Sequence, residues 1–89
     1  MKQILCKKNQ LTKIISNFGR GYPQTFNVTL IPEGNEEVSG IYIEKRYFWI
    51  FPETPIVGDL KEKMQFRRYW INGIYSVAIK PNNNVVVEY

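Results

Sequence analysis

The sequence contains no histidine, and Cys6 is its single cysteine. Histidine is the usual general base near neutral pH and a frequent zinc ligand, so its absence excludes the classical catalytic triads and histidine-based zinc sites. One cysteine can form neither an internal disulfide nor an iron–sulfur centre. We therefore expect no enzyme activity, no metal and no cofactor, and we expect Cys6 to be a buried apolar residue.

Long apolar stretches are also missing. The longest one, Tyr47 to Phe51, is five residues long, whereas a membrane-spanning helix needs about 20. Lys7 and Lys8 interrupt the apolar start too early for a signal peptide. These features predict a cytoplasmic protein. We expect residues 1–89 to form a single domain, because two halves would each be too small to bury a core.

The charges are unevenly distributed along the chain. The net charge is +4, residues 1–31 carry five cations and no acid, and residues 32–62 hold seven of the eight acids. The last third is basic again. Such a layout either builds a basic face opposite an acidic one, which would attract nucleic acid or an acidic protein, or is neutralised across neighbouring strands. The sequence does not choose between these two arrangements.

The apolar pattern predicts a fold that is mainly β. Residues 25–31 alternate between apolar and polar, and residues 3–7, 40–51 and 85–89 also read as strands. Residues 9–18 have apolar side chains at helical spacing, so we predict a short N-terminal helix there, although their β-branched residues keep a strand as an alternative. The expected architecture is α+β, either a small antiparallel curved sheet or an SH3- or OB-like barrel of about five to six strands.

The run from Tyr47 to Phe51 would make residues 40–51 apolar on both faces at their end. One interpretation is a central strand covered by the predicted helix, and the other is a surface that meets a partner. We favour the central strand.

Asn72 and Gly73 are the strongest local signal, because this pair favours a two-residue hairpin turn. A hairpin around them would place Trp70 opposite Tyr75 and Arg67 opposite Ala78. One face would then belong to the core and would carry Phe66, Trp70, Tyr75, Val77 and Ile79. The other face would be open and would carry Arg67, Tyr69, Ser76 and Ala78.

The open face is the candidate functional surface, since Ser76 and Ala78 are small and leave room beside an arginine and a tyrosine. The alternative is a solvated outer face whose cross-strand pairs only stabilise the hairpin. An arginine beside an aromatic side chain occurs at the centres of protein interfaces and in proteins that bind single-stranded nucleic acid. The predicted binding residues are Arg67, Tyr69, Ser76, Arg46, Phe48 and Arg20.

We expect a non-catalytic module that docks on a protein partner, as small accessory, inhibitory or phage-type proteins do. Binding of single-stranded nucleic acid is the alternative, and a histidine-free ribonuclease of the small-toxin type is the third choice. A homodimer is also expected if residues 85–89 form an unprotected edge strand.

Overall fold

The computed structural model describes residues 2–19, 24–68 and 73–89, with side chains for residues 2–16, 24–67 and 74–89. The described residues form nine strands: β1 (Gln3–Cys6), β2 (Thr12–Gly19), β3 (Gln24–Pro32), β4 (Gly40–Phe48), β5 (Phe51–Pro52), β6 (Ile56–Asp59), β7 (Lys63–Arg68), β8 (Gly73–Pro81) and β9 (Val85–Glu88). Every described strand pairing is antiparallel.

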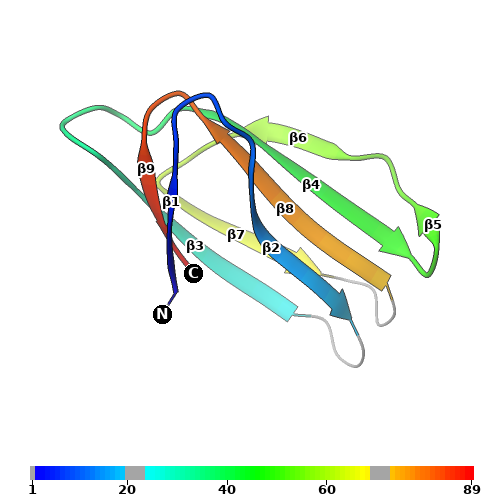
Figure 1. Cartoon of the computed structure of the whole chain (residues 1–89). Coiled ribbons are helices and arrows are strands. Elements are labelled where there is room, and N and C mark those ends of the chain that lie inside the picture. The colour runs from blue at the N-terminus through cyan, green and yellow to red at the C-terminus, as the bar shows by residue number, and fades with distance from the viewer. Residues whose placement is uncertain (1, 20–23, 69–72) are drawn as a thin grey trace.

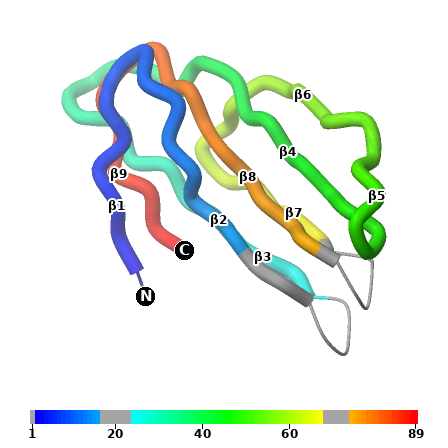
Figure 2. The backbone as a smooth tube through the Cα atoms, turned by 45° about the vertical axis from the view of Figure 1, so that its right-hand side comes forward, coloured from blue at the N-terminus to red at the C-terminus, as the bar shows by residue number. Residues whose placement is uncertain are grey.

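The strands form two sheets that stack face to face (Figures 1 and 2). Sheet A has the order β1-β9-β3-β7. Sheet B has the order β2-β8-β4, with β6 beside β4 and the short β5 paired to the end of β4. The chain changes sheet at every connection except those from β4 through β5 to β6, which is the strand order of a jelly roll. The predicted mainly β, antiparallel architecture is therefore confirmed, and the described strands form two stacked sheets, whereas the sequence left open a single curved sheet or a barrel of about five to six strands.

The predicted N-terminal helix is wrong, because most of residues 9–18 belong to strand β2. A β-bulge between Lys13 and Ile15 shifts the register against β8, and it lets two consecutive residues, Ile14 and Ile15, both face the core. The bulge thus accounts for the adjacent apolar pair Ile14 and Ile15 within the helix-like spacing, whereas Leu11 of the same pattern is exposed. No helix in the described part of the chain is long and apolar enough to cross a membrane.

The core lies between the two sheets and is built from their alternating inward-facing residues. The buried apolar side chains include Val28 and Leu30 of β3, Val77 and Ile79 of β8, and Cys6 of β1. Two aromatic pairs join the sheets. Phe26 stacks on Tyr75 with ring centroids 5.9 Å apart, and Tyr42 meets Phe66 edge to face at 5.2 Å.

The predicted hairpin around Asn72 and Gly73 is wrong. Strand β7 pairs with β3 in sheet A, whereas β8 pairs with β2 and β4 in sheet B. Between residues 68 and 73 the chain therefore passes from one sheet to the other. Phe66, Tyr75, Val77 and Ile79 are buried as predicted, because two strands that face each other across a core bury the same alternating residues as a hairpin with one covered face. Trp70, also predicted to face the core, lies outside the described residues.

The predicted edge position of residues 85–89 is also wrong. Strand β9 pairs with β1 on one side and with β3 on the other. Its valines Val85 and Val87 are buried in the core, so this strand offers no free edge for the expected homodimer.

Backbone contacts tie the loops together at the end of the sandwich that carries the turn between β1 and β2. The amide of Asn9 donates to the carbonyl of Pro81 at 2.8 Å, and the amide of Asn82 donates to the carbonyl of Ser39 at 2.9 Å. Gly40 begins β4 there with φ +129°, and a side chain at this position would collide with the carbonyl oxygen of Lys80. Only glycine lets β4 start this close to β8.

Candidate functional site

The residues predicted to form one binding face do not come together. Arg67 lies on the exposed side of β7, opposite Thr25 of β3. Ser76 lies on β8, in the other sheet, opposite Ser16 and Lys45. The two therefore lie on opposite outer faces of the sandwich, because the hairpin that was to join them does not form. Tyr69 and Arg20 lie outside the described residues.

Arg46 faces the interior instead of a partner. Its guanidinium forms an ion pair with Glu44 of the same strand, and both side chains are largely buried. The guanidinium also donates to the backbone carbonyl of Arg67 at 3.0 Å, and it lies 5.7 Å from the centre of the Tyr75 ring. Arg46 thus links β4 of sheet B to β7 of sheet A.

Phe48 belongs to the most exposed apolar feature of the described chain, which we call the apolar tip (Phe48–Phe51). The exposed fractions are 45% for Phe48, 58% for Trp49, 83% for Ile50 and 65% for Phe51. Phe48 pairs with Phe51, so Trp49 and Ile50 form a two-residue turn between β4 and β5. Figure 1 shows this turn at the end of sheet B that lies far from the chain termini.

The backbone of the apolar tip is strained. Trp49 has φ 57°, in the left-handed region that a bulky residue rarely adopts. Holding a non-glycine residue there costs about 1–3 kcal/mol. A glycine would form the same turn without this strain, so the tip retains a large aromatic side chain at an energetic cost.

Strand β6 extends the apolar surface along the neighbouring edge of sheet B. Ile56 and Val57 are both exposed, and they pair with Glu44 and Ile43 of β4. The same edge of the sheet thus carries the apolar tip and two further aliphatic side chains.

A second candidate lies on the outer face of sheet B, and we call it the lysine groove. It has a volume of about 270 Å³ and runs over β8, with Ser76 and Ala78 among its lining residues. The remaining lining residues are Leu11, Lys13, Ile43 and Lys45. The sequence correctly indicated that Ser76 and Ala78 leave open space, but the neighbours that wall this space are lysines of β2 and β4.

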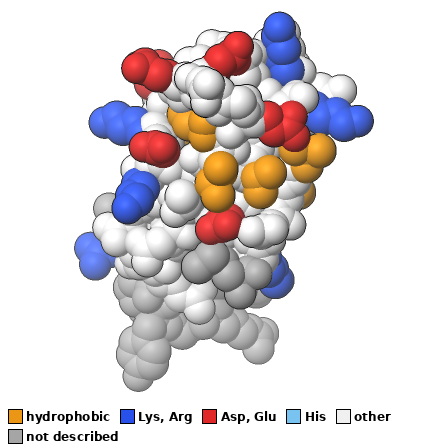
Figure 3. Space-filling model, turned by 90° about the vertical axis from the view of Figure 1, so that its left-hand side faces the viewer, with side chains coloured by type: hydrophobic (Ala, Val, Ile, Leu, Met, Phe, Trp, Pro, Cys, Tyr) orange, Lys and Arg blue, Asp and Glu red, His pale blue; other side chains and the backbone are white. Residues whose placement is uncertain are grey.

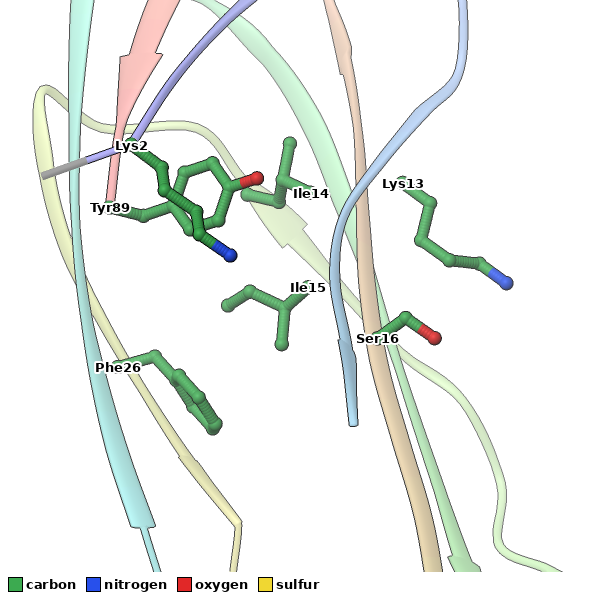
Figure 4. Close-up of a pocket in the computed structure, with 7 residues that line it drawn as sticks. All are labelled: Lys2, Lys13, Ile14, Ile15, Ser16, Phe26 and Tyr89. Atoms are coloured by element: carbon green, nitrogen blue, oxygen red, sulfur yellow. The ribbon is translucent and has the colours of Figure 1, made fainter. Parts of the chain in front are cut away.

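A third hollow opens between the sheets beside β2 and has a volume of about 610 Å³. Figure 4 shows Ile14, Ile15, Phe26, Tyr89 and Lys2 around the space between the sheets, while Lys13 and Ser16 point away from it. Its walls are core side chains that the short β1 leaves uncovered. The polar side-chain groups that lie beside the hollow in Figure 4 are the amine of Lys2 and the hydroxyl of Tyr89.

Two chemical features of the described residues concern metal binding and nucleophilic attack. No group of three or more His, Cys, Asp or Glu side chains is placed to hold a metal among them. Burial raises the pKa of the Cys6 thiol, and a hydrogen bond with Thr12 opposes this effect more weakly. A buried thiol with a raised pKa is a poor nucleophile.

The uneven charge along the sequence does not produce a single-sign surface on the side of the molecule that Figure 3 presents. Lysine and arginine side chains are interspersed there with aspartates and glutamates, and apolar side chains lie between them. Segments of opposite charge therefore meet on this side of the molecule.

In comparisons with known proteins, no family model, no curated protein and no solved structure matched this chain. A jelly roll by itself carries no function. The function must therefore be inferred from the surfaces described above.

For Trp49, Ile50 and Phe51 the sequence favoured a central strand and left a surface that meets a partner as the alternative, and the structure exposes all three. The signal was present in the apolar run from Tyr47 to Phe51, but the predicted covering helix assigned this run to the core. Strand β2 lies inside sheet B in place of that helix, and Phe48 to Phe51 are exposed.

Proposed function

We propose that this protein is a non-catalytic binding module that docks on a protein partner through its apolar tip. The observation that supports this proposal is that four consecutive apolar residues at the turn between β4 and β5 are exposed: Phe48, Trp49, Ile50 and Phe51. Their exposed fractions correspond to roughly two and a half complete side chains, which a partner's pocket would remove from water with a gain of about 4–7 kcal/mol.

The chemistry of the tip favours a protein pocket. Interface hot spots are rich in large aromatic side chains that insert into well-packed apolar pockets. The tip is convex, because its most exposed residue, Ile50, lies in the turn itself, so it suits a concave apolar surface.

Nucleic acid is a poorer match for this tip. Nucleic-acid binding requires cations that neutralise phosphates, and between Tyr47 and Pro55 the only charged residue is Glu53. The alternative of a single-strand binder relied on Arg67 and Tyr69 beside Ser76, and the face that would have combined them is not formed.

To test this proposal, Ile50 of the full chain is replaced by a photo-crosslinking amino acid, and crosslinking is carried out in the cells that produce the protein. Ile50 suits this purpose because it makes little contact with the rest of the protein. A matched protein carries the crosslinker at Lys63, which is exposed on β7 in the other sheet. Proteins captured from Ile50 but not from Lys63 are then purified, and their binding to the wild-type chain and to Ile50→Asp is measured by calorimetry.

We expect a captured protein to bind the wild-type chain and to lose at least about tenfold in affinity with Ile50→Asp, because a carboxylate cannot enter an apolar pocket without a large desolvation cost. Ile50→Asp should unfold at the temperature of the wild type within a few degrees. Three results would refute the proposal: no captured protein that binds in purified form, tip-dependent binding to lipid vesicles alone, or tip-dependent assembly of the chain with itself.

A further inference from the structure

The lysine groove differs from the apolar tip in its chemistry and lies on a different part of sheet B. Its floor carries the small side chains of Ser76 and Ala78 on β8. Lys13 lies opposite Ala78 on β2, and Lys45 lies opposite Ser76 on β4. One lysine thus flanks the floor on each side, and the two lysines are offset from each other by two residues along β8.

The surroundings of the groove are basic. Lys80, exposed on β8, continues the outward-facing row of that strand, and its neighbour Ile41 is exposed. Asp59 lies on β6, two strands away from β8, and it lines a neighbouring hollow together with Lys80. The ion pair between Glu44 and Arg46 lies inside the sandwich, away from this face. Among the described residues neither Lys13 nor Lys45 forms an ion pair, so both bring positive charge to a groove whose floor is small and whose walls carry Leu11 and Ile43.

We propose that the lysine groove binds an extended acidic segment of a protein chain, in which carboxylates alternate with aliphatic side chains. The carboxylates would contact Lys13 and Lys45 on the two sides of β8. The aliphatic side chains would cover Leu11 and Ile43, and the small floor residues would let the backbone approach closely. This inference goes beyond the apolar tip and does not depend on it.

The dimensions of the groove favour a peptide over a small molecule. Neighbouring strands are about 4.8 Å apart, so the walls on β2 and β4 are about 10 Å apart, which is wide enough for one extended chain. The volume of about 270 Å³ lies below the range of roughly 300–1,000 Å³ that is typical of small-molecule pockets. An open trough of this size fits one or two side chains of a longer ligand.

The lining residues also favour a peptide over a nucleic acid. Single-stranded nucleic acids bind by stacking their bases on aromatic side chains. None of the six residues that line the groove is aromatic. The carboxylates of a peptide could pair with the two lysines, and its aliphatic side chains could pack on Leu11 and Ile43.

The test measures binding of fluorescein-labelled synthetic peptides to the full-length protein by fluorescence anisotropy. The first peptide alternates leucine with aspartate and glutamate, and the second replaces these acids with asparagine and glutamine. A labelled oligouridylate is the third probe. The variants are Lys13→Glu and Lys45→Glu in the groove, Ala78→Leu to fill it without a charge change, and Lys63→Glu on β7 as the control with the same change in net charge.

We expect the acidic peptide to bind at low salt and the neutral peptide to bind at least about tenfold more weakly. Each groove lysine variant should weaken the acidic peptide by about five- to tenfold, because an attraction becomes a repulsion. Lys63→Glu should change the affinity by less than about twofold. Ala78→Leu should weaken binding at every salt concentration, since it acts by filling space.

Several results would overturn the proposal. The groove is not the binding site if Lys63→Glu weakens binding as much as Lys45→Glu does. The ligand class is wrong if the neutral peptide binds equally well, if no peptide binds, or if the oligouridylate binds more tightly with the same dependence on Lys45. Ile50→Asp should leave binding of the acidic peptide unchanged, so failure of the apolar tip and failure of the lysine groove are distinguishable.

Discussion

The strained turn at Trp49 gives a prediction whose sign is unusual. Trp49→Gly and Trp49→Ala remove the same indole ring, so the packing of its buried part is missing equally from both variants. The two variants differ only in a Cβ atom at a residue with φ 57°. Their difference in the free energy of unfolding therefore reports the strain at this position, reduced by the entropic cost of glycine.

Two opposing effects set the magnitude. Glycine costs about 0.5–1 kcal/mol relative to alanine at ordinary positions, because it loses more backbone entropy on folding. A Cβ atom in the left-handed region costs roughly 1–2 kcal/mol. The strain wins, so we expect Trp49→Gly to be more stable than Trp49→Ala by about 0.5–1 kcal/mol. For a domain of this size, such a difference raises the midpoint of thermal unfolding by about 2–8 °C.

Equilibrium unfolding in urea, followed by far-ultraviolet circular dichroism, measures this difference without relying on tryptophan fluorescence. The control is the same pair of substitutions at Ile50, which is not among the described residues with positive φ. There we expect the usual order, with alanine the more stable variant. If Trp49→Ala is as stable as Trp49→Gly or more stable, the left-handed turn is not present in solution, and the tip does not retain its tryptophan at an energetic cost.

Two further predictions concern the interior. Arg46→Ala should lower the free energy of unfolding by about 3–4 kcal/mol, because it leaves Glu44 buried without its cation. The double variant Glu44→Gln with Arg46→Met should lower it by less, because no charge is then left unpaired. If urea unfolding gives the same loss for the single and the double variant, the ion pair does not have this stabilising role. The raised pKa of Cys6 means that above about pH 8.5 the unfolded chain releases its thiol proton before the folded protein does. The free energy of unfolding should therefore fall from that pH upward toward the folded pKa, and a Cys6→Ala variant with an equally steep fall would show that the thiol is not the cause.

The sequence by itself determined several of the strands and several of the residues that they bury. Alternation of apolar and polar residues placed strands at β1, β3, β8 and β9, and it identified Phe66, Tyr75, Val77 and Ile79 as buried. These predictions succeeded because the side-chain period of a strand depends only on its own backbone, and every strand must bury one face wherever it lies. The small residues Ser76 and Ala78 likewise indicated open space on the outer face, since their size does not depend on their neighbours.

Only the tertiary structure decided which strand lies beside which. Asn72 and Gly73 suit a hairpin, but β7 and β8 join different sheets, and this choice follows from contacts between residues far apart in the chain. The placement of β2 in sheet B removed the helix that was expected to cover Tyr47–Phe51, so the same run became an exposed tip. The lysine groove has the same origin, because Lys13, Lys45 and Ser76 belong to three strands, and only their pairing brings the two cations to the sides of one floor.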